Sequence, residues 1–175
     1  MDRREYLLGA VGVVGSGLGA YYVLDRDGGH DRIEPTTIEV FRETGRTEIR
    51  LPAAEGLTVV DLFSTYCSGC DEQIASLEPI HLDASGAVSI VSLTTQHVGD
   101  EFTVSDLRTW WDRNGGPWPV GVDDGTVAGA IGVEELPTVA VLDPEGTIHW
   151  TGSSVSTGEL RERLQRARST ADAEE

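Results

Sequence analysis

Two cysteines three positions apart, Cys67 and Cys70, are the residues of this sequence best suited to do chemistry. They are the only cysteines among 175 residues, so one chain cannot build a network of structural disulfides or a four-thiolate zinc site. The pair can bond to each other as a stable bridge, form half of a metal site that a partner completes, or act as a redox dithiol. Thiol-disulfide exchange needs one attacking thiolate and a second thiol within reach, and this spacing favours that redox role.

The segments on either side of the cysteines predict how the dithiol is positioned. Leu57 to Phe63 is nearly all apolar, which predicts a strand buried on both faces and therefore central in a sheet. Apolar spacing from Cys67 to about Asp83 predicts a helix with a kink near Pro79. The first cysteine then sits where the helix begins, and the partial positive charge of a helix N-terminus favours its thiolate.

The rest of the chain alternates between strand and helix patterns. In chain order we expect a hairpin over 36–41 and 47–51, a strand over 87–93, a helix over 104–113 capped by Thr103 or Ser105, a short strand over 119–122, a short helix over 126–131, a strand over 136–142, a turn over 143–146, a strand over 147–151 and a helix over 157–168. This order predicts an α/β fold with a central mixed β-sheet and helices on both faces.

The N-terminal residues predict a membrane segment. From Tyr6 to Leu24 the chain has 19 residues without a charge, preceded by Arg3 and Arg4. That length just reaches what a membrane helix needs, and the paired arginines resemble a twin-arginine export signal. We therefore expect residues 1–24 to be a signal or membrane anchor, 25–35 a tether, 36–168 one globular domain and 169–175 a disordered tail. The domain would be extracytoplasmic at the cell membrane, or secreted if the signal is cleaved; no A-x-A-like cleavage site follows the apolar run.

The charge is strongly one-sided. The formal net charge is −17, and all 13 basic residues are arginine. A nucleic-acid partner is disfavoured, because no basic patch exists to meet phosphates. An acidic surface can repel anionic partners or keep a protein dissolved in very salty surroundings. We favour the second interpretation, because concentrated salt screens self-repulsion, and the composition resembles that of halophilic archaeal proteins.

The dithiol, a later proline and the order of elements together resemble the thioredoxin superfamily, and within it the membrane-tethered TlpA/ResA-type thiol-disulfide oxidoreductases. The resemblance covers about residues 36–168. Asp61 to Cys70 is similar to the family's strand-to-CxxC signature, and Glu135-Leu136-Pro137-Thr138 is similar to its cis-proline loop. The helix and short strand between Leu93 and Thr126 resemble the TlpA-type insertion.

The resemblance implies a role for each site residue. Cys67 would be the nucleophile, Cys70 the resolving thiol and Asp61 the acceptor of the Cys70 proton, against a purely structural, hydrogen-bonded Asp61. Many TlpA-type proteins instead carry a glutamate three residues after the second cysteine, where this chain has Gln73. The positions that would bind substrate are Tyr66, Leu136 and Pro137, and those that would tune the redox potential are Ser68 and Gly69.

The same resemblance implies no cofactor. The expected partners are client protein disulfides and an electron donor, either membrane-bound or of the thioredoxin type. A different class of function also stays open, a Sco-type copper metallochaperone that would use both cysteines and one histidine, with His97 the best placed. Its CxxxC spacing differs from the C-x-x-C found here. The chain also lacks the peroxiredoxin motif P-x-x-x-[TS]-x-x-C.

Overall fold

The sheet is organised around β3 (Leu57–Phe63), in which every residue is buried. In this computed structural model the described residues are 32–42, 44–83 and 86–174. Strand β3 pairs in parallel with β4 (Val88–Thr94) and antiparallel with β6 (Thr138–Leu142). A central apolar strand flanked on both sides is what the run of buried residues predicts.

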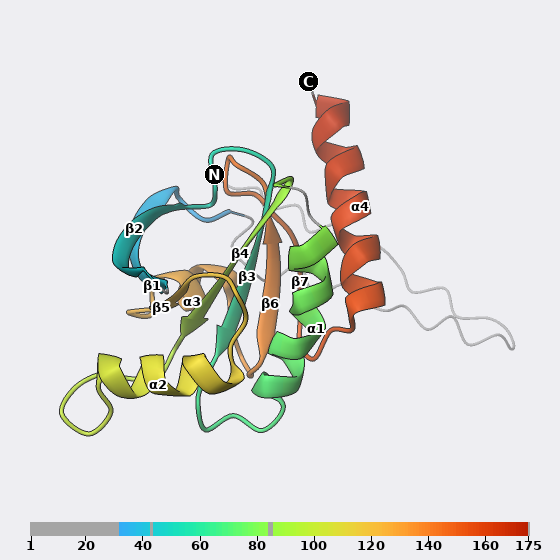
Figure 1. The fold of residues 1–175 in the computed structure, drawn as a ribbon. Helices are drawn as coiled ribbons and strands as arrows, with labels where there is room; N and C mark the ends of the chain where they lie inside the picture. Colours follow the sequence, from blue (N-terminus) through green and yellow to red (C-terminus); the bar gives the residue numbers. More distant parts are fainter. Residues whose placement is uncertain (1–31, 43, 84–85, 175) are drawn as a thin grey trace, which may run out of the picture.

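Four further strands complete one seven-stranded sheet, in the order β2-β1-β5-β4-β3-β6-β7 (Figure 1). Strand β5 (Val120–Val122) pairs in parallel with β4, and β7 (Ile148–Gly152) pairs antiparallel with β6. The hairpin of β1 (Thr36–Arg42) and β2 (Gly45–Leu51) joins the sheet through β5. The mixed sheet and the hairpin at one edge are confirmed.

Helices cover both faces of the sheet and enclose two cores. Three helices pack on one face of the sheet and share the first core: α1 (Cys70–Asp83), α2 (Val104–Asn114) and α4 (Thr157–Glu174). The second core, on the opposite face, is covered by α3 (Thr126–Ile131). In β3, Val59 and Phe63 face the first core and Val60 and Leu62 the second. Because side chains alternate along a strand, Asp61 faces the three-helix side, where Cys70 also packs.

The helix after the dithiol begins later than its sequence pattern predicts. Its first residue is Cys70, and Cys67 lies in the preceding turn. Gly69 explains the difference, because its φ of 92° belongs to the left-handed region and interrupts a right-handed helix at that point. Pro79 lies inside the helix, as predicted.

At both ends of the domain, a boundary in the structure differs from the one predicted from the sequence. Helix α4 runs to Glu174, so the tail expected to be disordered over 169–175 is helical as far as that residue. The hydroxyls of Ser169 and Thr170 bond back to carbonyls one turn earlier, which keeps these residues compatible with a helix. The tether predicted over 25–35 does not extend through Ile33, which is buried and donates its N–H to the carbonyl of Gly146.

Gly146 makes this docking possible. A Cβ at this position would lie 1.9 Å from the carbonyl oxygen of Ile33, and the residue has a φ of 94°. Only glycine therefore lets the turn after β6 approach the incoming chain so closely.

The anchor predicted over residues 1–24 lies outside the described residues. Among the helices formed by residues 32–42, 44–83 and 86–174, none combines the length and the apolar character that crossing a bilayer demands.

Candidate redox site

The two cysteines are joined in a disulfide at the end of β3, with an S–S distance of 2.05 Å. Cys70, the first residue of α1, is fully buried, whereas Cys67 is partly exposed. Solvent and partners therefore reach the sulfur of Cys67 first. An accessible sulfur paired with a sheltered one is an arrangement that thiol-disulfide exchange can use.

Asp61 faces the side of the sheet on which Cys70 packs, and it has no exposed surface. Its Oδ2 accepts a hydrogen bond of 2.7 Å from the hydroxyl of Ser92, while its Oδ1 is buried without any hydrogen-bond partner. Burial raises the pKa of Asp61 from 3.8 to about 7, and the Ser92 bond only partly opposes this rise. The carboxyl can therefore gain or lose a proton near neutral pH.

Ser92 is itself held by a second residue. On β4 it stands directly opposite Asp61 of β3, and its hydroxyl accepts a bond of 2.9 Å from the indole N–H of Trp118. Ser92 and Trp118 are both buried. Neither Ser92 nor Trp118 is assigned a role from the sequence, although a serine inside the apolar run 87–93 was an available signal.

Gln73, at the position of the glutamate in many TlpA-type proteins, has a different environment. It is 2% exposed, and its amide bonds in both directions with the backbone of Val155: its Nε2 donates to the carbonyl at 3.1 Å, and its Oε1 accepts from the N–H at 2.7 Å. The side chain joins α1 to the segment before α4. Gln73 is therefore a structural link here.

Aromatic and apolar side chains lie at the same end of the sheet as the outer cysteine. Tyr66 is 81% exposed, and its ring lies 6.4 Å from that of Phe102. Leu136 is partly buried and Pro137 buried, with a cis bond between them as predicted. Because Thr138 pairs with Leu62, the proline loop lies at the end of the sheet where β3 delivers the dithiol. The predicted substrate residues and the dithiol thus share one end of the sheet, and Phe102 is an addition that the sequence interpretation missed.

A glutamine fixes the loop that carries the outer cysteine. Gln96 Oε1 accepts bonds from the Thr65 hydroxyl at 2.7 Å, the Thr65 N–H at 3.3 Å and the Ser64 hydroxyl at 3.4 Å. The sequence interpretation misses this residue, and its place just after the core strand β4 was the only signal. Ser68 and Gly69, between the cysteines, are exposed and partly exposed.

Among the described residues, the three histidines have separate surroundings. His81 packs beside the ring of Trp118, with centroids 5.7 Å apart, and His149 bonds to Asp143 at 2.9 Å. His97 is exposed in the loop after β4. Within residues 32–42, 44–83 and 86–174, no three His, Cys, Asp or Glu side chains are arranged to hold a metal ion.

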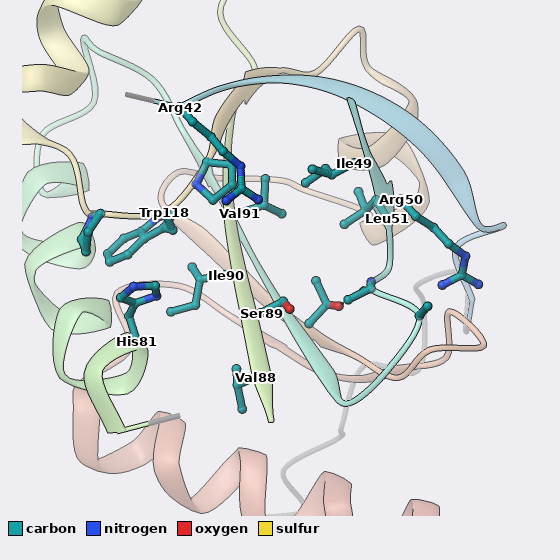
Figure 2. Close-up of a pocket in the computed structure, with 15 residues that line it drawn as sticks. Arg42, Ile49, Arg50, Leu51, His81, Val88, Ser89, Ile90, Val91 and Trp118 are labelled. Carbon is teal, nitrogen blue, oxygen red and sulfur yellow. Dashed lines mark hydrogen bonds between the residues drawn. The ribbon is translucent and has the colours of Figure 1, made fainter. Parts of the chain in front are cut away.

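A separate pocket of about 470 Å³ opens between the start of β4 and the β1–β2 hairpin. Figure 2 shows His81 and Trp118 on one side of it and Ile49 and Leu51 on the other. Neither cysteine nor Asp61 lines it. The pocket therefore meets the redox site only through Trp118.

Comparison with known proteins identifies the fold. No family profile matches this sequence, and no curated protein is significantly similar to it. Solved structures do match: StoA from Bacillus subtilis at 18% identity, covering 74% of this chain and 96% of that one with a TM-score of 0.61, and the exposed lipoprotein thioredoxin Etrx1 from Streptococcus pneumoniae at 20% identity, covering 75% and 99% with a TM-score of 0.62.

A third structure, a putative thiol:disulfide interchange protein DsbE from Chlorobium tepidum, is 13% identical, with 78% of this chain and 97% of that one covered and a TM-score of 0.62. At such identities the likeness speaks for the fold. The chain described here has a thioredoxin-like fold.

Proposed function

We propose that this protein is a thiol-disulfide oxidoreductase that reduces disulfides in client proteins. One observation carries the proposal: a partly exposed sulfur is bonded to a fully buried one, and a buried carboxyl with an unused oxygen lies on the same face of the sheet. A structural bridge would need no proton acceptor. A resolving thiol does, because it must lose its proton before it can attack.

The reaction proceeds in two exchanges. In the reduced protein the Cys67 thiolate attacks one sulfur of the client disulfide, and the electron pair of the broken bond leaves on the other client sulfur. Cys70 then gives its proton to Asp61 and attacks Cys67, forming the intramolecular disulfide and releasing the second client sulfur as a thiolate. The client gains two electrons and the protein loses two, so a dithiol reductant must restore the starting state.

The client would meet the protein on the surface formed by Tyr66, Phe102 and Leu136. Phe102 and Leu136 pack against the same core as Cys67, Tyr66 precedes Cys67 in the chain, and all three leave apolar area exposed or partly exposed. An extended segment with apolar side chains fits this chemistry, and the backbone at Leu136 would pair with it as an added strand.

The finer assignment follows the sequence. We propose a TlpA/ResA-type protein, supported by α2 and β5 between β4 and α3, and an anchor in residues 1–24 that places the domain outside the cytoplasm. In that setting the electron donor would be a membrane dithiol protein or a thioredoxin-type protein. The acidic, lysine-free composition supports work in high salt.

Trapping the mixed disulfide tests the proposal. The reduced Cys70→Ser variant should accumulate a covalent adduct with a labelled peptide that contains one disulfide, because Cys67 can attack but nothing resolves the product. The matched Cys67→Ser variant should form far less adduct, since its remaining thiol is buried. Equal trapping by both variants, or none by either, would reject the assignment.

The direction of transfer is tested by the reduction potential. Equilibrating the protein with a glutathione series in high salt should give a value below about −230 mV for a reductase. A value near −120 mV would mark an oxidant and overturn the proposed direction.

A further inference from the structure

We propose that Ser92 and Trp118 are positioning residues that direct the proton of Cys70 to one atom, Oδ1 of Asp61. This inference rests on the proposed function and adds to it which oxygen accepts the proton and which residues decide this. It starts from the hydrogen-bond chain Trp118 to Ser92 to Asp61, whose donor-acceptor distances are 2.9 and 2.7 Å.

In this hydrogen-bond chain the direction of donation is fixed by the groups that form it. An indole N–H only donates, so the hydroxyl oxygen of Ser92 must accept from Trp118. A serine hydroxyl has one proton, and here that proton is directed at Oδ2 of Asp61. Trp118 thereby stops the hydroxyl from turning its proton elsewhere.

The two oxygens of Asp61 are therefore unequal. Oδ2 already receives a proton donor and Oδ1 receives none, although both are buried. An unpaired buried acceptor is costly, so Oδ1 is the atom that gains most from a new proton. The Ser92 bond favours the carboxylate, and the pKa of about 7 leaves Asp61 ionised often enough to accept.

The hydrogen-bond chain also ends at Trp118, because an indole N–H does not relay a proton. Proton exchange with Asp61 is then left to Oδ1, and this carboxyl faces the side of the sheet against which Cys70 packs. The buried side chains that cover this face from α2 and α4 are apolar: Leu107, Trp111, Leu160, Leu164 and Ala167. Of the titratable groups on α1, Cys70 is buried in this core and His81 lies beside the Trp118 ring. The four carboxylates of the helix are exposed: Asp71, Glu72, Glu78 and Asp83.

The test measures protonation of Asp61 and its consequence separately. Infrared spectra of the full-length oxidised protein, taken as a pH series with Asp61→Asn as the blank, follow the protonated carboxyl directly. In Ser92→Ala the midpoint should move upward by about one pH unit, because a bond that favours the carboxylate is lost. Ser92→Thr, which keeps the hydroxyl, should retain the midpoint of the unmodified protein.

Trp118→Phe should move the midpoint in the same direction by a smaller amount, because Ser92 keeps its proton but loses the fixed orientation. Trp111→Phe is the matched control: Trp111 packs 6.2 Å from Trp118 in the same core, and its replacement should leave the midpoint unchanged. Stopped-flow measurement of mixed-disulfide resolution should show the acidic limb of the pH profile shifting with the infrared midpoint.

Each outcome decides one point. If Ser92→Ala and Trp118→Phe leave both midpoints in place while Asp61→Asn slows resolution, the positioning role is rejected and the function stands. If Trp111→Phe shifts the midpoint as much as Trp118→Phe, packing and not the indole bond is responsible. If Asp61→Asn resolves at the rate of the unmodified protein, the proton-acceptor role itself fails.

Discussion

Asp61 in the core and Asp143 in the turn after β6 are both buried aspartates, yet their pKa values move in opposite directions. Burial raises the pKa of Asp143 too, but bonds from Thr147 and His149 outweigh it and hold that pKa below its ordinary value. Both of its oxygens are engaged: Oδ1 accepts from the Thr147 N–H at 2.8 Å and Oδ2 bonds to His149 at 2.9 Å. Asp61 has one such bond and one vacant oxygen.

This difference in bonding separates an aspartate that supports the fold, Asp143, from one that is suited to proton transfer, Asp61. In Asp143 each carboxylate oxygen has a partner, and this carboxylate stabilises the turn, whose Gly146 carbonyl accepts a hydrogen bond from Ile33. The buried Asp61 oxygen without a partner costs stability, so its presence on the face of the dithiol is better explained by proton transfer than by support of the fold. The two aspartates would not differ in this way if Asp61 proved to be only structural, or if Asp143 affected thiol-disulfide exchange.

The largest effect should appear in the exchange rate. Replacing Asp61 with Asn removes the proton acceptor but keeps the size of the side chain, so mixed-disulfide resolution at pH 7 should slow by about a hundredfold or more. Stopped-flow kinetics with a disulfide peptide would measure it. Asp143→Asn is the control and should resolve at the unmodified rate; a comparable slowing in that variant would erase the distinction.

The same Asp61→Asn variant should be more stable at alkaline pH. The folded pKa of about 7 lies above the ordinary value of 3.8, so between these values the folded state holds the extra proton and stability falls as pH rises. At pH 8 and above the variant should gain on the order of 2 to 4 kcal/mol, the lower figure reflecting a buried amide N–H left unpaired.

Denaturant unfolding of the oxidised proteins from pH 3 to 9 would measure this gain. The two curves should approach each other as the pH falls toward 3, below the ordinary pKa of 3.8, where Asp61 becomes protonated in both the folded and the unfolded state. A constant difference across the whole range would mean that the substitution acts through packing and not through charge.

Asp143→Asn should have the opposite sign. Its lowered pKa means that the carboxylate stabilises the fold above the ordinary pKa of 3.8, and that this contribution is lost as pH falls through the folded pKa. We expect a loss of about 2 kcal/mol at pH 7, because two bonds to a charged group are weakened. The same unfolding series would detect it, and a loss that persists undiminished at pH 3 would contradict the charge-based explanation.

Much of the fold could be predicted because strand and helix patterns are local. The buried strand at β3, the hairpin at the edge and the short helix α3 follow from runs and periods that need no knowledge of the neighbours. The dithiol and the proline loop were predicted from motif resemblance, and the strand register places them at one end of the sheet.

The parts that could not be predicted depend on pairings between distant segments. Nothing local tells that Ser92 stands opposite Asp61, or that Trp118 reaches its hydroxyl across 26 positions of sequence. Gln73 gives the same lesson, since its partner Val155 is 82 positions away. The sequence can name polar residues in apolar surroundings, whereas only the three-dimensional arrangement shows which of them are satisfied.

The smallest effect on stability should come from His149, which is one of the two partners of Asp143. His149→Phe preserves a ring but removes one of the two partners of Asp143, while the N–H of Thr147 still holds Oδ1. We expect a loss of about 1 kcal/mol at pH 7, less than for Asp143→Asn, with no change in exchange rate. Denaturant unfolding of the two single variants and the double variant would measure their coupling. If the loss for His149→Phe equals or exceeds that for Asp143→Asn, the histidine supports the turn by its own packing, and the carboxylate is not the centre of that network.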